Sequence, residues 1–127
     1  MSRLILLIIL GALASYYIPE SREALMDMIS PALTPMFRWQ TQHEMGQVAR
    51  EVQFYERDNY GRVPDPKRFP TWVNSNFTEG AAIDSWGGGY VLFVERDSFA
   101  IVSWGPDQVP RTEDDLRVAR RLSRPRR

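Results

Sequence analysis

The chain has 127 residues, enough for one ordinary domain with a single core, and its 43% hydrophobic and 25% charged composition is typical of globular proteins. Sixteen basic and sixteen acidic residues cancel, so the overall charge favours neither a nucleic-acid partner nor a polyanionic substrate. The absence of cysteine excludes disulfides, thiol chemistry and cysteine-ligated zinc or iron–sulfur sites.

An uncharged hydrophobic segment, residues 4–18, lies near the start of the chain. It is apolar on every side rather than along one stripe, which indicates a membrane segment more than a helix of a soluble core. We interpret residues 1–19 as a retained single-pass anchor. The alternative is a cleaved signal peptide, because Ala12-Leu13-Ala14 has the small-x-small form of a cleavage site. In both cases Arg3 stays inside and the rest of the chain is exported.

Residues 20–40 are predicted to form a helical stalk that is interrupted by Pro31 and Pro35. Ser21 is a suitable N-cap for its first helix, which Pro31 would end or kink. Such a stalk would lift the following domain off the membrane.

The expected domain, residues 41–118, begins with an amphipathic helix. Thr41-Gln42-His43-Glu44 fits a capping box, and apolar residues then recur at three- and four-residue steps as far as Asp58. Turn-forming residues follow and predict a loop from Asn59 to about Asn76. The apolar positions of the predicted helix are Met45, Val48, Ala49, Val52 and Tyr55.

Two β-rich runs, residues 90–95 and 99–104, flank a polar turn and predict an antiparallel hairpin. Two strands alone are marginal in water, so the helix is expected to cover one face. The predicted fold class is therefore α+β, with a hydrophobic N-terminal helix and stalk, and then one amphipathic helix packed on a small antiparallel sheet. Six arginines crowd the last eleven residues, and residues 119–127 are predicted to be a solvated basic tail, contact with anionic lipid or nucleic acid being the alternative.

An enzyme is not expected. His43 is the only histidine, which excludes a pair of histidine metal ligands and makes a Ser-His-Asp triad depend on one residue. Nothing in the sequence places two acids across a cleft, as a glycosidase would require. Trp86 and Trp104 flank the predicted hairpin, and we expect them to pack against the domain rather than to stack on a ligand.

Three segments carry a family resemblance. Residues 55–64 are similar to a helix end and turn with the sequence Tyr, Asp-Asn-Gly-Arg-Tyr-Pro, with Tyr60 as an extra residue. Residues 84–90 are similar to Asp-Pro-Trp-Gly-x-Pro-Tyr without its prolines, and residues 103–116 to Ser-x-Gly-Pro-Asp-Gly…Gly-Thr-x-Asp-Asp-Ile. In this order, over residues 48–116, the chain resembles the periplasmic domain of the major pseudopilins of type II secretion systems, a type IV pilin-like family.

The resemblance implies that residues 103–116 bind a structural calcium ion, which prefers oxygen ligands. Two glycines of the family motif are replaced by Gln108 and Arg111, at positions where glycine would allow positive φ. The other interpretation, which stays open, is a loop whose Thr112 caps a short helix with acids in its first turn. The predicted calcium ligands are Ser103, Asp107, Thr112, Asp114 and Asp115.

The resemblance also implies a non-catalytic structural or assembly protein of a type II secretion or pilus-like envelope machine. It would be held in the inner (cytoplasmic) membrane by residues 4–18, with its C-terminal domain in the periplasm, in contact with pilin-like subunits or secretion-platform proteins and with no nucleic acid.

The start of the chain departs from the family. Pseudopilins are cut at a Gly-Phe junction and carry a glutamate early in the mature helix, whereas this chain has no such junction near its start and no acid before Glu20. Either the true start lies upstream of Met1, or, as we favour, the protein is not processed and polymerised like a pilin. The alternative function is therefore an exported envelope binding module on the same scaffold that does not polymerise.

Overall fold

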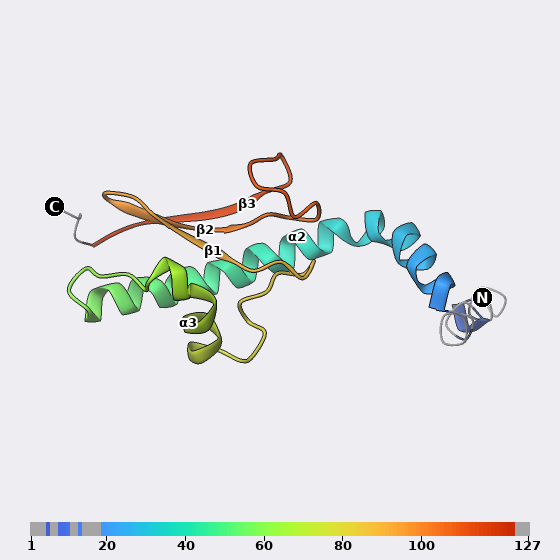
Figure 1. Cartoon of the computed structure of the whole chain (residues 1–127), viewed down its shortest axis with the longest axis horizontal. Helices are drawn as coiled ribbons and strands as arrows, with labels where there is room; N and C mark the ends of the chain where they lie inside the picture. Colours follow the sequence, from blue (N-terminus) through green and yellow to red (C-terminus); the bar gives the residue numbers. More distant parts are fainter. Residues whose placement is uncertain (1–4, 6–7, 11–12, 14–18, 124–127) are drawn as a thin grey trace. The chain divides into compact units, whose positions relative to one another are not determined.

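The computed structural model describes residues 5, 8–10, 13 and 19–123 (Figure 1). It divides into two compact units, Met1–Pro35 and Met36–Arg127. Most of the predicted anchor, residues 4–18, lies outside the described residues. Within the residues described, no helix combines the length and the hydropathy that a membrane span requires.

Helix α2 spans Pro19–Asp58 and continues through both Pro31 and Pro35. Each proline removes one N–H donor, and helix-forming residues on both sides keep the helix continuous. The prediction of a helix start at Thr41 is therefore wrong. Thr41 lies in the middle of α2, fully buried, and its hydroxyl donates to the hydroxyl of Ser85 at 2.9 Å. The residue that suggested a cap has a tertiary partner instead.

The predicted apolar stripe of the helix is confirmed in the second unit, where it forms part of one hydrophobic core. Figure 1 shows this part of α2 running alongside the three strands. Tyr55 is only half-buried, and its ring meets Trp72 edge-on at 5.6 Å between centroids. The buried members that α2 contributes to the core are Met45, Val48, Ala49 and Val52.

A three-stranded antiparallel sheet has the order β1-β2-β3, with β1 at Val91–Val94, β2 at Ser98–Ser103 and β3 at Leu116–Arg121. The α+β class and the hairpin of β1 and β2 are thus confirmed. Leu92 pairs with Ile101 and Ile101 pairs with Val118, so these buried side chains form one row across the core face.

Strand β3 corrects the prediction of a basic tail from residue 119. Leu116 and Val118 point into the core while Arg117 is exposed and pairs with Glu95 at 3.0 Å. Beyond the strand, the hydroxyl of Ser123 donates to the carboxylate of Glu56, which is 2% exposed, at 2.7 Å. The domain therefore extends at least to Ser123, and residues 124–127 lie outside the described residues.

The predicted loop of residues 59–76 contains two helices, η1 at Pro66–Arg68 and α3 at Phe69–Asn76. Pro66 and Pro70 suggest a loop in the sequence, but they occupy first-turn positions, where a helix needs no N–H donor. Phe69 and Val73 of α3 are buried in the core. The side chain of Asp65 caps η1 by accepting from the N–H of Lys67 at 3.0 Å.

Helix α2 ends in a left-handed turn that carries a tyrosine. The N–H of Gly61 donates to the carbonyl of Glu56 at 2.8 Å, as in a Schellman motif. In that motif the residue before Gly61 adopts positive φ, and here it is Tyr60, with φ of 59° and a side chain that is 86% exposed. Tyr60 thus has a Cβ atom in a left-handed conformation that glycine adopts with the least strain. Because its side chain is mostly exposed, little burial offsets this strain.

Replacing Tyr60 by glycine should stabilise the protein by about 0.5–1 kcal/mol, because it relieves the left-handed strain and removes little packing. The measurement is thermal unfolding of the full chain in mild detergent, followed by near-UV circular dichroism. Tyr60→Ala is the matched control, since it keeps a Cβ atom and should give no such gain. Equal melting temperatures for the glycine and alanine variants would contradict the expected strain.

Candidate functional site

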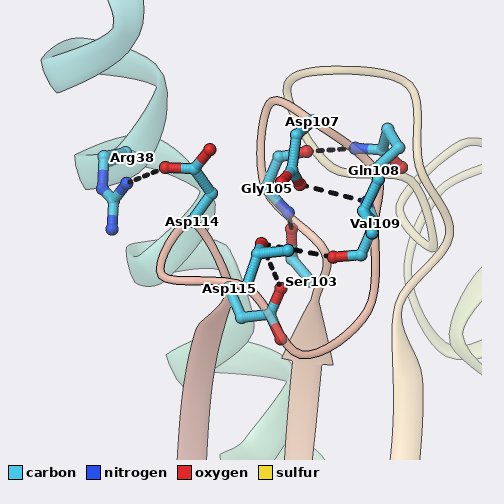
Figure 2. Close-up of polar contacts among 9 residues, drawn as sticks. Arg38, Ser103, Gly105, Asp107, Gln108, Val109, Asp114 and Asp115 are labelled. Atoms are coloured by element: carbon cyan, nitrogen blue, oxygen red, sulfur yellow. Dashed lines mark hydrogen bonds and ion pairs between the residues drawn. The ribbon is translucent and has the colours of Figure 1, made fainter.

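The predicted calcium loop joins β2 to β3 at one end of the sheet, between the paired residues Ser103 and Leu116 (Figure 2). It consists of two turns. In the first, the N–H of Gln108 donates to the carbonyl of Gly105 at 3.3 Å, and in the second the N–H of Asp115 donates to the carbonyl of Thr112 at 3.3 Å. The short helix expected after Thr112 is therefore replaced by a turn.

Three of the four acidic side chains of the loop each have a separate partner. Asp107 accepts from the N–H of Val109 at 3.0 Å. Asp115 accepts from the N–H of Arg111 at 2.9 Å and from the hydroxyl of Thr112 at 3.3 Å. Figure 2 shows the third carboxylate turned toward α2.

That third carboxylate belongs to Asp114, which faces the guanidinium of Arg38 at 3.7 Å. No group of three or more acids or histidines able to hold a metal ion occurs among the described residues. Calcium takes six to eight oxygen ligands around one point. In this arrangement the five predicted ligands do not fit a calcium site, and calcium binding stays a prediction from the resemblance.

The fifth predicted ligand, Ser103, is fully buried and belongs to a different network, whose centre is Asp84. The Asp84 carboxylate is 5% exposed and accepts from four groups. One oxygen takes the N–H groups of Trp86 at 3.0 Å and Gly88 at 2.8 Å. The other takes the hydroxyl of Ser103 at 2.6 Å and the amide of Gln108 at 3.4 Å.

Asp84 therefore ties the turn of residues 84–88 to the end of β2 and to the first turn of the loop. Asp84 begins the second segment of the family resemblance, and nothing in that motif connects it to Ser103. A signal was present, because the alternation along β2 puts Ser103 on the same face as Phe99 and Ile101. A serine on a buried face requires a hydrogen-bond partner.

Three loop residues adopt the left-handed region that favours glycine. Gly105 has φ of 67°, and a Cβ atom there would overlap the carbonyl oxygen of Asp114. Gln108 has φ of 53° and Arg111 has φ of 66°. Both positions have the conformation that glycine favours, although neither residue is glycine.

The two tryptophans near the hairpin do not face each other. Trp86 meets Phe37 of α2 edge-on at 6.2 Å, and Trp104 meets Phe93 of β1 at 6.1 Å. Trp86 also packs against the core. These contacts agree with the packing role that we expected.

An open cavity of about 510 Å³ lies between α2 and the segment of residues 77–85. Its lining includes Glu44, Glu79 and Asp84, and no lysine or arginine occurs among the described residues that line it. Glu44 accepts from the amide of Gln40 at 2.9 Å and from the hydroxyl of Tyr90 at 3.2 Å. Burial raises the pKa of Tyr90 above its ordinary value, and the negative charge of Glu44 raises this pKa further.

Replacing Asp84 by asparagine should destabilise the protein by about 1.5–3 kcal/mol, because one acceptor oxygen becomes a donor that faces other donors. The free energy of unfolding in urea measures the loss. Asp97→Asn is the matched control, because the Asp97 side chain is exposed. Among the described residues its hydrogen bond is the one that its backbone carbonyl accepts from the N–H of Leu122, which the substitution leaves in place. Equal losses in both variants would show that Asp84 has no special role.

The raised pKa of Tyr90 predicts a loss of stability at alkaline pH. Below the ordinary pKa of 10.0 the phenol is neutral in both states and its contribution is complete. Above that pH the unfolded chain ionises first, so the folded state loses stability by up to about 1.4 kcal/mol for each pH unit. Above pH 10 the unfolding free energy of the wild type should therefore fall relative to that of Tyr90→Phe, which has no hydroxyl group to ionise. Parallel pH curves would contradict this assignment.

Comparisons of the chain with protein-family models, with curated proteins and with solved structures found no match.

Proposed function

We propose that the protein is a membrane-anchored, pseudopilin-like structural subunit of a type II secretion or pilus-like envelope machine, without catalytic activity. The observation that carries the proposal is the continuity of α2, which begins directly after the hydrophobic segment and contributes residues between Met45 and Val52 to the core of the α+β unit. One helix thus belongs to both parts of the chain. This is the order of elements that the resemblance implies, with the domain in the periplasm and the anchor in the inner membrane.

The hydrophobic segment supports the anchor. Its described residues, Ile5, Ile8, Ile9, Leu10 and Leu13, all have exposed side chains. Exposed apolar side chains are stable in lipid or against other apolar helices.

The outer face of α2 supports packing against similar subunits. Met36 and Phe54 are exposed and lie eighteen positions apart, which is about five helical turns and so the same side. Trp39 is close to that side, is 69% exposed and stacks on His43 at 5.6 Å. Large apolar side chains in one row of a helix indicate a contact surface for another helix. Pilin-like subunits or secretion-platform proteins are the partners that we propose for this row.

The cavity beside α2 favours a second candidate, an exported binding module that does not polymerise. It combines the apolar side chains of Phe77 and Ile83 with the acids Glu44 and Glu79. Such a lining suits a basic or amphipathic segment of another envelope protein. In this function the row of α2 would have no subunit partner.

A pull-down from native membranes in mild detergent distinguishes the two candidates. With a C-terminal tag on the full-length protein, mass spectrometry should identify pilin-like subunits or secretion-platform proteins and the N-terminal peptide of the mature chain. The double variant Trp39→Ala with Phe54→Ala should lose most of these partners, because it removes the two aromatic side chains of the row. Tyr60→Ala is the matched control, since Tyr60 is as exposed but lies beyond the end of α2.

Recovery of the protein alone, with Met1 and the hydrophobic segment intact, would overturn the structural role and favour the binding module. Equal loss of partners in the Tyr60 control would mean that the row on α2 is not the contact surface.

A further inference from the structure

The side-chain amide of Gln108 joins the two parts of the β2–β3 loop region. Its nitrogen donates to the carboxylate of Asp84 at 3.4 Å and to the backbone carbonyl of Gly105. The same Asp84 oxygen accepts the hydroxyl of Ser103 at 2.6 Å. Hard cations bind carboxylate and carbonyl oxygens. The Asp84 carboxylate and the Gly105 carbonyl, which both accept from the Gln108 nitrogen, are therefore oxygen atoms of the kind that a cation at this position would bind.

We propose that the amide of Gln108 closes this loop in place of a metal ion, so that the loop is ordered without calcium. An amide nitrogen carries two N–H donors and can hold two acceptors together. The two acceptors of this amide belong to two different segments. One is the carboxylate of Asp84, at the start of the turn of residues 84–88, and the other is the carbonyl of Gly105, in the first turn of the loop. The inference does not depend on assembly with pilin-like subunits, because every contact in it lies within one chain.

The surroundings of the loop agree with closure by an amide. The carboxylates of Asp107 and Asp115 are held by backbone N–H groups of the loop itself, and Asp114 faces Arg38. A calcium ion would have to take these carboxylates from their partners. The guanidinium of Arg38 beside Asp114 would also repel a second positive charge there.

Gly88 provides the space in which the Gln108 side chain lies. A Cβ atom at Gly88 would overlap the amide group of Gln108. Gly88 is not among the residues with positive φ, so its backbone would accept alanine and only the space would be lost. Its N–H also donates to Asp84 at 2.8 Å, and this hydrogen bond fixes the position of the Gly88 backbone beside the Gln108 amide. Gly88 and Gln108 are therefore a complementary pair.

The first test is thermal unfolding of the full chain in mild detergent, with millimolar calcium chloride and with a chelator. Near-UV circular dichroism reports on the loop, because Trp104 lies within it and Trp86 lies in the turn of residues 84–88 that Asp84 ties to it. The melting temperature of the wild type should differ by less than about 1 °C between the two conditions, since a ligand that binds only the folded state would raise it. A rise of several degrees with calcium would overturn the proposal.

Variants at residue 108 test the amide itself. Gln108→Ala should lower the melting temperature by about 5–10 °C, because two hydrogen bonds that close the loop are lost. Gln108→Glu keeps the shape but places a second carboxylate against Asp84, so it should lower the melting temperature at least as much. Val109→Ala is the control in the same loop, at a half-exposed side chain. A Gln108→Glu variant that melts like the wild type would overturn the role of the N–H donors.

A double-mutant cycle tests the pair of Gly88 and Gln108. Gly88→Ala should lower the melting temperature of the wild type, because the new methyl group displaces the amide, and should have little effect in the Gln108→Ala background. Equal effects in both backgrounds would show that the amide does not occupy this space. If Gln108→Ala does not fold, the comparison of calcium with chelator on the wild type still decides the proposal.

Discussion

The buried carboxylate of Asp84 is the constraint on which the arrangement around the candidate site depends. No ion pair of Asp84 occurs among the described residues, so hydrogen-bond donors alone balance its charge. A buried charge that loses its donors is costly, and each donor must therefore stay in place. Two of the donors are N–H groups of the turn at residues 86–88, and two are side chains of Ser103 and Gln108. The turn, the end of β2 and the loop are thereby fixed relative to one another.

The parts of the fold that follow a period could be predicted from the sequence. The steps of three and four residues from Met45 to Val52 and the two β-rich runs gave the core face of α2 and the hairpin, because burial on one face imposes those periods. Strand β3 was missed since only Leu116 and Val118 mark its inner face, among arginines that belong to its outer face and its end. Helix α3 was missed because Pro70 suggests a loop, whereas in the first turn of a helix a proline is well tolerated.

The candidate site shows a different limit of prediction. The sequence indicated a turn-rich loop with many oxygen atoms and marked Gln108 and Arg111 as replacements for glycine, and both do adopt positive φ. What composition does not contain is the direction of each side chain. Asp107 and Asp115 bond to N–H groups within a few residues, and such local bonds compete with any shared ligand. The network of Asp84 and Ser103 spans nineteen residues and depends on the register of the sheet, which a local motif does not specify.

Two buried carboxylates hold the sheet at its opposite ends. Ser103 pairs with Leu116 at one end, where Asp84 accepts the Ser103 hydroxyl, and Ser98 pairs with Arg121 at the other, beyond which Glu56 accepts the hydroxyl of Ser123. The two acids come from outside the sheet, from the turn at residue 84 and from α2. Because successive side chains of a strand point to opposite faces, a slip of one residue in either strand would turn a serine away and leave a carboxylate buried without its donor. The two pairs thus stabilise one register of β2 and β3 and one position of this sheet against the end of α2, in addition to the apolar core.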